Sequence, residues 1–200
     1  MEKLNLKTVE NFLTIQECKE VIDYCIPFMN NSSILDYDNI ESNDLFRKSY
    51  DTWINKDIDI PIFNKIRNGI VKYSDLPEGN QESLSVIQYP VGGIFKDHYD
   101  YLHPNTSYYE TECNSRGGQR IKTCMIYLND DFVGGNTEFT TIDVSITPKT
   151  GKLICWNNAD ENLDLIDESK HRGNVVEAGN KWILVAWIRA NTFILSPGEF

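Results

Sequence analysis

Two histidines and one aspartate carry the clearest chemical signal in this sequence. His98 and Asp100 are separated by one residue, and His171 follows much later in the chain. Side chains repeat every second residue along a strand, so an extended segment places His98 and Asp100 on one face. A second imidazole from a distant strand would complete two nitrogen ligands and one oxygen ligand around a metal ion. This donor set is typical of non-heme Fe(II) sites that keep the opposite side open, so His98, Asp100 and His171 are candidate metal ligands and catalytic residues.

Taken one at a time, these residues are weak evidence for a metal site. A His-x-Asp pair arises often by chance, and a single histidine such as His171 more often hydrogen-bonds in the core or at the surface. The third histidine, His103, lies in a long polar stretch, where a place on the surface or in a lid is expected. The metal hypothesis therefore depends on the combination, because His98 and His171 fall on two predicted strands that would be neighbours.

A lysine near the end of the chain adds to this pattern. One face of the last predicted strand carries Lys181, Ile183, Val185 and Trp187. An unpaired buried ammonium is costly, so a lysine in this row predicts a cavity that binds a carboxylate ligand. The other interpretation is that Lys181 lies at the mouth of the strand and extends its ammonium into water. The spacing alone leaves both interpretations open.

A second predicted strand, residues 119–129, is consistent with a cavity. Thr123, Met125 and Tyr127 share one of its faces, because their positions differ by two. This mixture of a hydroxyl, a thioether and a phenol suits a ligand-binding cavity better than a dry core.

Two helices are expected in the N-terminal part of the chain. Thr14 and Glu17 form a capping-box pattern ahead of a helix that ends by residue 29. Residues 60–73 have the apolar spacing of a second helix. A polar loop is predicted between them at 30–46, followed by a strand at 47–54.

From residue 83 onward the sequence has short apolar segments separated by turn residues. Strands are expected near 84–90, 94–100, 119–129, 137–140, 143–147, 152–157, 170–177 and 181–190. The long polar segment 101–118 is expected to be a loop beside the metal site that acts as a lid, with Tyr101, Tyr108 and Tyr109 available to stack on a substrate. The pattern predicts a mainly β fold with N-terminal helices and a jelly-roll core.

Length, charge and cysteine usage narrow the class of protein. The chain has 200 residues, and we expect one domain over 1–200, with a support layer in 1–82 and the jelly-roll core in 83–190. A formal net charge of −11 disfavours nucleic acid as a partner. Five cysteines without a Cys-x-x-Cys pair predict reduced thiols. The sequence shows neither an apolar leader nor an apolar segment of membrane-spanning length, so a cytoplasmic protein with no membrane partner is expected.

Several blocks along the chain carry a family resemblance. They are VENFL at 9–13, RKS at 47–49, SLSVIQYPVGGIFKDHYDY at 83–101, RIKTCMIYLN at 120–129, Gly134-Gly135, TEF at 137–139, HRGNVV at 171–176 and GNKW at 179–182. Together they resemble the prolyl 4-hydroxylase family of Fe(II)/2-oxoglutarate-dependent dioxygenases. The resemblance extends over nearly the whole chain, and one departure from the family pattern is the segment 101–118.

This resemblance implies a double-stranded β-helix that uses Fe(II), 2-oxoglutarate and O2, with ascorbate as the expected reductant. It implies that His98, Asp100 and His171 hold the iron and that Lys181 pairs with the far carboxylate of 2-oxoglutarate. The remaining cofactor-binding positions implied by the family are Tyr89, which would hydrogen-bond 2-oxoglutarate, Thr123 and Tyr127, which would line its pocket, and Trp187, which would lie near the substrate end.

The expected reaction is prolyl 4-hydroxylation of a peptide or protein substrate. One alternative keeps the same cofactors and changes the substrate to a lysyl residue, a free amino acid or a small metabolite. A second alternative is a non-enzymatic jelly-roll binding protein. A nucleic-acid demethylase is disfavoured by the charge of −11. The sequence leaves the identity of the substrate and the oligomeric state open.

Overall fold

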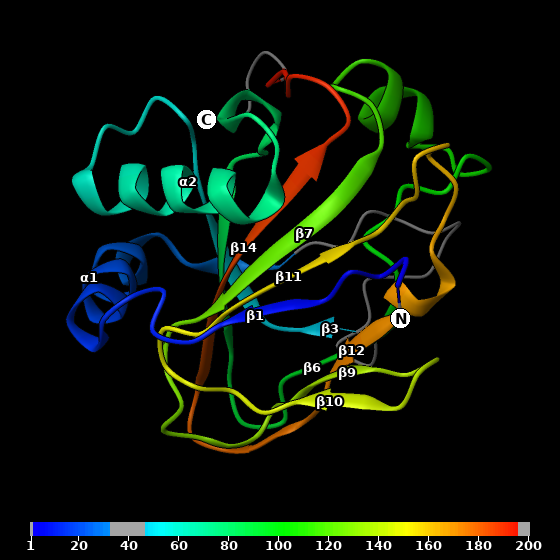
Figure 1. Cartoon of the computed structure of the whole chain (residues 1–200). Coiled ribbons are helices and arrows are strands. Elements are labelled where there is room, and N and C mark those ends of the chain that lie inside the picture. The colour runs from blue at the N-terminus through cyan, green and yellow to red at the C-terminus, as the bar shows by residue number, and fades with distance from the viewer. Residues whose placement is uncertain (1, 33–46, 196–200) are drawn as a thin grey trace.

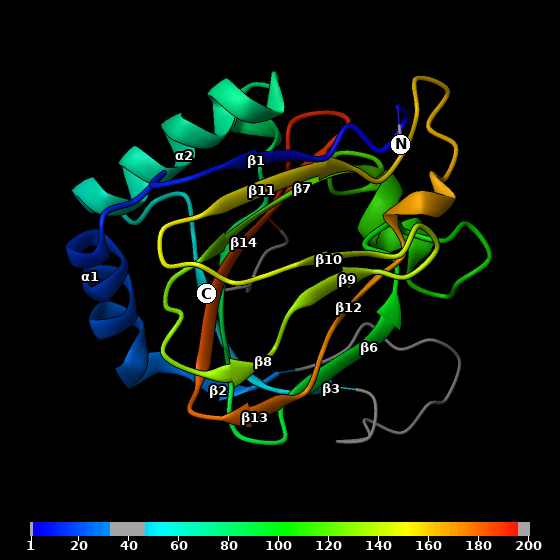
Figure 2. The ribbon, with the colours of Figure 1, turned by 60° about the horizontal axis from the view of Figure 1, so that its bottom comes forward.

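Two antiparallel sheets face each other, and helices cover the outer side of the larger sheet (Figure 1). The structure is a computed structural model, and it describes residues 2–32 and 47–195. Figure 2 shows the three layers from another side, with the helices, the larger sheet and the smaller sheet following one another. The fold is therefore mainly β with N-terminal helices, as the sequence predicts.

The larger sheet forms the middle layer of the molecule. Within the described residues its seven strands are, in spatial order, β1 (Lys7–Val9), β11 (Leu153–Asn157), β7 (Arg120–Tyr127), β14 (Lys181–Arg189), β5 (Leu84–Tyr89), β4 (Tyr50–Ile54) and β2 (Asn30–Asn31). Strand β14 lies between β7 and β5 and is buried along its whole length. This central position explains why apolar side chains occupy both of its faces.

The smaller sheet forms the outer layer opposite the helices. Its five strands in the part of the chain that the structure describes are, in spatial order, β10 (Val144–Ile146), β9 (Thr137–Phe139), β12 (His171–Gly173), β6 (Ile94–His98) and β3 (Arg47–Lys48). A separate pair is formed by β13 (Val176–Ala178) and β8 (Val133–Gly134). Strands β6 and β12 are neighbours, as expected for the two strands that carry the histidines.

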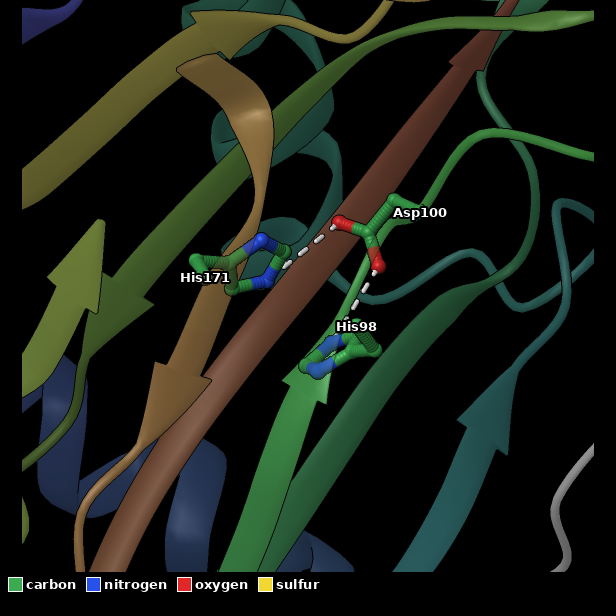
Figure 3. Close-up of side chains that lie close together, drawn as sticks. All are labelled: His98, Asp100 and His171. Atoms are coloured by element: carbon green, nitrogen blue, oxygen red, sulfur yellow. Dashed lines mark ion pairs between the residues drawn. The ribbon is translucent and has the colours of Figure 1, made fainter. Parts of the chain in front are cut away.

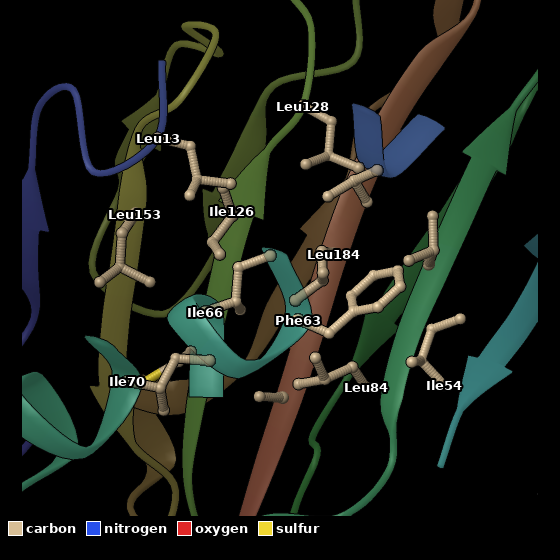
Figure 4. Close-up of a cluster of buried hydrophobic side chains, with 14 of the residues drawn as sticks. Leu13, Ile54, Phe63, Ile66, Ile70, Leu84, Ile126, Leu128, Leu153 and Leu184 are labelled. Carbon is tan, nitrogen blue, oxygen red and sulfur yellow. The ribbon is translucent and has the colours of Figure 1, made fainter. Parts of the chain in front are cut away.

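Two apolar clusters fill the space on the two sides of the larger sheet. The strand period of two sends Leu184 of β14 and Ile126 of β7 toward the helices, where they pack with Phe63 and Ile66 (Figure 4). The opposite face of the same strands, which includes Ile183, belongs to the cluster between the two sheets. The alternation predicted for these strands is thus confirmed, and it separates the structural core from the face that looks toward the smaller sheet.

The helices begin where the sequence signals place them. Helix α1 (Ile15–Cys25) starts after Thr14, whose hydroxyl accepts from the Glu17 amide at 3.2 Å, while the Glu17 carboxylate accepts from the Thr14 amide at 2.9 Å. Helix α2 (Pro61–Ser74) has a proline at its first position. In the described part of the chain, no helix combines the length and the apolar character needed to cross a membrane.

Short helical turns connect the larger elements. They are the 3-10 turns η1 (Ile26–Phe28), η2 (Glu78–Asn80) and η4 (Asp167–Ser169) and the π-helical turn η3 (Glu110–Asn114). The last of these lies in the segment 101–118, which was expected to be a loop.

The structure corrects three of the predicted segments. Residues 47–54 are not one strand: β3 pairs with β6 in the smaller sheet, whereas β4 pairs with β5 in the larger one. Residues 170–177 are likewise divided between β12, which pairs with β6 and β9, and β13, which pairs with β8. The predicted loop 30–46 begins with strand β2, and its residues 33–46 lie outside the described residues. In the two divided segments the chain leaves one sheet to join another, which residue type alone does not indicate.

A buried ion network ties the segment 101–118 to the larger sheet. The Glu82 carboxylate, 4% exposed, accepts from Arg120 Nε at 2.6 Å and from Arg189 Nε at 2.5 Å. Arg189 also donates to the carbonyls of Glu112 and Gly118 at 2.6 and 2.9 Å. Burial alone would raise the pKa of Glu82, but the two guanidinium groups more than offset this and hold the pKa below its ordinary value.

We expect Glu82→Gln to lower the free energy of unfolding by about 3–5 kcal/mol, because it removes the carboxylate that two buried guanidinium groups share, and of these only Arg189 keeps another carboxylate partner among the described residues, Glu112 at 3.2 Å. Urea denaturation of the two proteins measures the difference. Glu138→Gln is the control, since Glu138 pairs with Arg172 where the side chains are 20% and 41% exposed. Such a pair contributes up to about 1 kcal/mol. Equal losses of unfolding free energy in the two variants would show that the buried Glu82 network contributes no more to stability than the more exposed pair.

Candidate metal centre

The three predicted ligands lie together between the two sheets. Strands β6 and β12 pair in antiparallel register with His98 opposite His171. Asp100 lies two residues beyond the end of β6 and turns its carboxylate toward both imidazoles (Figure 3). Asp100 Oδ1 is 3.7 Å from His98 Nε2, and Asp100 Oδ2 is 3.8 Å from His171 Nε2. One potential ligand atom from each residue thus lies within 4.8 Å of the others, which is close enough to surround a single ion.

Backbone carbonyls fix the orientation of both imidazoles. His98 Nδ1 lies 2.7 Å from the Lys96 carbonyl oxygen, and His171 Nδ1 lies 2.9 Å from the Ser169 carbonyl oxygen. A carbonyl can only accept, so each Nδ1 carries a proton, and Nε2 is the ring nitrogen that is available to bind a metal ion. Both Nε2 atoms face Asp100. Hydrogen bonds at the other ring nitrogen orient histidine ligands in this way in metal sites.

The electrostatics favour the ligating forms of His98 and Asp100. Burial and the neighbouring His171 lower the pKa of His98 to about 3, which keeps its imidazole neutral at physiological pH. Burial alone would raise the pKa of Asp100, but the two imidazoles and a hydrogen bond from Thr123 hold it below its ordinary value. Two imidazoles and one carboxylate on one side of a cavity are the donor set expected for Fe(II) with open coordination positions. The residues present therefore fit the metal that the sequence predicts.

A cavity adjoins the three ligands. It contains about 460 Å³ of empty space, its open mouth included, and both sheets line it. The larger sheet contributes side chains from β5, β7, β11 and β14, and the smaller sheet contributes side chains from β3, β6, β9 and β12.

Lys181 points into this cavity and not into solvent. It is 2% exposed and lines the cavity wall, so the interpretation in which its ammonium extends into water is wrong. Its Nζ donates to the Gly135 carbonyl at 2.6 Å, and among the described residues it has no carboxylate partner. Burial lowers the pKa of Lys181 to about 7. A buried amine of this kind needs an anionic ligand to be stably charged.

The remaining predicted binding residues surround Lys181 in different ways. Tyr89 is directly opposite Lys181 in the β14–β5 pair, and its ring centroid is 5.4 Å from Lys181 Nζ. Burial raises the pKa of Tyr89, so the phenol keeps its proton and can donate a hydrogen bond. Tyr127 is absent from the cavity wall: its ring is 5.6 Å from Lys181 Nζ, and its hydroxyl donates to Thr137.

Thr123 and Trp187 both line the cavity, and they are directly opposite each other across β7 and β14. The hydroxyl of Thr123 donates to Asp100 Oδ2 at 2.7 Å and therefore acts on a predicted metal ligand. The Trp187 ring is covered by the guanidinium of Arg120 at 4.3 Å, and its centroid is 5.6 Å from that of the exposed Trp53.

Sequence reasoning missed several residues of this site. Thr137 lines the cavity and accepts from Tyr127 at 2.8 Å. Phe95 stacks on the His98 ring with a centroid separation of 3.6 Å. Gly135 supplies the carbonyl that binds Lys181. A signal for Thr137 was available, because it opens a predicted strand two residues after the Gly134-Gly135 pair.

The structure also changes the interpretation of the segment 101–118. Tyr101 is 8% exposed, and its hydroxyl donates to the Leu163 carbonyl at 3.0 Å. It is therefore part of the packed interior and cannot stack on a substrate, contrary to expectation. Cys113 in the same segment is buried as well. Tyr108 and Tyr109 are partly exposed.

Comparison with known proteins agrees with this geometry. Residues 84–189 match the family described as the 2OG-Fe(II) oxygenase superfamily. Prolyl 4-hydroxylase 5 of Arabidopsis thaliana is 32% identical, over 92% of this chain and 67% of its own length. Prolyl 4-hydroxylase 2 of the same plant is 30% identical, again over 92% of this chain and 67% of its own length.

The fold matches a solved relative too. The viral collagen prolyl hydroxylase from Paramecium Bursaria Chlorella virus-1, in its 2OG complex, has a TM-score of 0.73 and 26% sequence identity to this chain. The match covers 92% of this chain and 96% of the viral one. The jelly-roll core expected from the sequence is thereby confirmed, and the cofactors are Fe(II), 2-oxoglutarate and O2. The chain belongs to the 2OG-Fe(II) oxygenase superfamily.

Proposed function

We propose that this chain is a prolyl 4-hydroxylase that acts on a proline residue of a peptide or protein. The observation that carries the proposal is the position of the buried Lys181 in the same cavity as His98, Asp100 and His171. An open metal site and a cationic anchor for a dicarboxylate are the two parts that a 2-oxoglutarate-dependent hydroxylase needs. The relatives named prolyl 4-hydroxylase, which align with 92% of the chain, support the choice of proline as the target.

The proposed roles follow from the contacts at the site. His98, Asp100 and His171 hold Fe(II), which together with 2-oxoglutarate and O2 supplies the oxidising power for hydroxylation of a C–H bond. Lys181 binds the distal carboxylate of 2-oxoglutarate, and the Tyr89 phenol donates to the same ligand. Ascorbate is the proposed external reductant. The apolar residues on the cavity wall exclude water from the reacting groups.

Trp187 is proposed to lie at the substrate end of the cavity. Its indole Nε1 is buried and has no hydrogen-bond partner among the described residues. A buried donor without an acceptor lowers the stability of the fold. We therefore assign a carbonyl of the bound ligands as the acceptor for Trp187 Nε1. For Tyr127, which lies off the cavity wall, the proposed contribution is to hold Thr137 beside the 2-oxoglutarate pocket.

The test of the proposed function has two stages. Anaerobic titration with Fe(II) and then 2-oxoglutarate is expected to produce the weak visible absorption band of a chelated keto acid. Aerobic turnover with proline-containing peptides is then expected to stimulate succinate formation and to add one oxygen atom to the peptide. Matched peptides with alanine or lysine in place of the proline serve as controls. Equal stimulation by the lysine peptide, or turnover that no peptide stimulates, would contradict a prolyl substrate.

We expect the affinity for 2-oxoglutarate to fall above pH 7. Burial lowers the pKa of Lys181 to about 7, so above that pH the free site holds a neutral amine. Binding of the dianion then has to take up a proton, which raises the apparent Kd by about tenfold for each pH unit. Below pH 7 the ammonium is already present, and this contribution disappears. Isothermal titration from pH 6 to 9 in two buffers of different ionisation enthalpy measures both the Kd and the proton uptake. A flat profile without proton uptake would contradict the assignment of Lys181.

Two further features are proposed for the protein as a whole. We propose that residues 1–200 act as one catalytic domain, in which 1–82 support the core formed by 83–190. Helices α1 and α2, which pack on the face of the larger sheet that points away from the smaller sheet, support this division. A cytoplasmic location is supported by the five cysteines, all of which are buried free thiols as in proteins of reducing compartments.

A further inference from the structure

Asp100 is held by a chain of two hydrogen bonds that begins at Asn158. Asn158 Nδ2 donates to Thr123 Oγ1 at 2.9 Å, and Thr123 Oγ1 donates to Asp100 Oδ2 at 2.7 Å. All three side chains are buried, and Asn158 and Thr123 are 0% exposed. Neither the sequence motifs nor the family resemblance points to Asn158, which follows directly after the last residue of β11.

The direction of this chain is determined by chemistry. A metal-binding carboxylate carries no proton, so it can only accept, and the hydroxyl of Thr123 has to donate its single proton to Asp100. The oxygen of Thr123 is then available only as an acceptor, and the group that faces it has to be the amide nitrogen of Asn158.

The backbone around Asn158 makes this amide a rigid donor. Its N–H donates to the Ile121 carbonyl at 2.8 Å, which ties it to the strand that carries Thr123. Its carbonyl accepts from the Ile166 amide at 3.0 Å. Its side-chain oxygen has no partner among the described residues, so one buried polar atom is left unsatisfied at this position. A buried amide oxygen without a partner lowers the stability of the fold. This cost argues that Asn158 serves through the hydrogen bond that its nitrogen donates to Thr123.

We propose that Asn158 is a positioning residue of the metal centre, which acts through Thr123 to engage Oδ2 of Asp100 and to leave Oδ1 as the oxygen for the metal ion. This inference rests on the proposed role of His98, Asp100 and His171 as ligands. Among the described residues, Oδ1 accepts no hydrogen bond, and its neighbour is His98 Nε2 at 3.7 Å. A carboxylate that uses one oxygen occupies one coordination position in place of two. The side of the metal ion that faces away from the three ligands would then stay open for 2-oxoglutarate and O2.

The test uses Co²⁺ as a probe, because its visible absorption reports coordination and does not depend on turnover. The metal-free chain is titrated with Co²⁺, and the Kd and the absorption spectrum are recorded for each variant. We expect Thr123→Val to weaken binding by about 10–100-fold and to change the spectrum, and Asn158→Leu to weaken it by about tenfold. Thr123→Ser keeps the hydroxyl and is expected to restore affinity to near the wild-type value.

A double variant separates action through Thr123 from an independent effect. Because Asn158 acts on Asp100 only through the threonine hydroxyl, Asn158→Leu is expected to add nothing to the loss caused by Thr123→Val. The control is Gln81→Leu. Like Asn158, Gln81 has a buried side-chain amide whose oxygen is unpaired among the described residues. Its nitrogen donates to the Arg67 carbonyl at 2.9 Å. Gln81→Leu is expected to leave the Co²⁺ Kd and spectrum unchanged.

The possible outcomes distinguish this inference from the proposed function. If Asn158→Leu alters the melting temperature but leaves the Co²⁺ Kd and spectrum at their wild-type values, Asn158 is only structural and the inference is overturned. Losses that add in the double variant would overturn it as well. Failure of the wild-type chain to bind Co²⁺ would instead remove the metal centre itself, and the proposed function with it.

Discussion

Replacement of His98 by alanine is expected to weaken the binding of divalent metal by more than about 100-fold and to abolish hydroxylation, while the chain stays folded. The loss exceeds the roughly 10–100-fold effect of removing an outer partner of a metal ligand, because one of three donors disappears. The fold is expected to survive because His98 is the last residue of β6 and belongs to neither apolar cluster. Titration with Fe(II) under nitrogen measures the affinity, and thermal unfolding of the metal-free proteins measures the fold.

His103→Ala is the matched control for this prediction. His103 is a histidine of the same region whose ring packs edge-on against Tyr99 and Tyr101, and it does not line the cavity. The variant is expected to keep its metal affinity. If both alanine variants lost metal equally, or if His98→Ala retained wild-type affinity, the assignment of His98 as a ligand would be refuted.

The second large effect is expected for Lys181→Met, which should remove 2-oxoglutarate binding and stabilise the metal-free protein at the same time. Loss of one partner of a buried charge pair costs about 2–5 kcal/mol, which corresponds to a rise in Kd of about 30-fold to several thousand-fold. In the absence of the ligand, however, the only hydrogen bond that the buried amine donates within the described residues goes to the Gly135 carbonyl. A thioether of similar length avoids the desolvation of the amine, so the melting temperature of the metal-free variant should rise.

Opposite changes in affinity and stability are the distinctive part of this prediction. Thermal unfolding without ligand and calorimetric titration with 2-oxoglutarate measure the two quantities on the same sample. Lys122→Met is the control, because Lys122 is on the other face of β7, away from the cavity. It should change neither quantity beyond a small amount. A Lys181→Met protein that bound 2-oxoglutarate within a few-fold of wild type would show that the anchor lies elsewhere.

Local patterns in the sequence were sufficient for a large part of this site. The period of two along 181–190 places Lys181 and Trp187 on the cavity face, and the structure has them there. The capping box at Thr14 and Glu17 starts a helix because its hydrogen bonds join residues three apart. The sequence was enough to predict that His98, Asp100 and His171 form one site, because each lies on or beside a strand with a recognisable pattern.

The type of the elements, the faces of the strands and the residue types that can bind a metal and a dicarboxylate could thus all be predicted from local sequence patterns. The tertiary structure alone decided that 47–54 is divided between two sheets, that Tyr101 is buried and that Asn158 reaches Asp100 through Thr123. The physical reason is the range of the interactions. Strand periodicity and helix caps depend on neighbours a few residues away, whereas Asn158 and Thr123 are separated by 35 residues, and only the pairing of β11 with β7 brings them together.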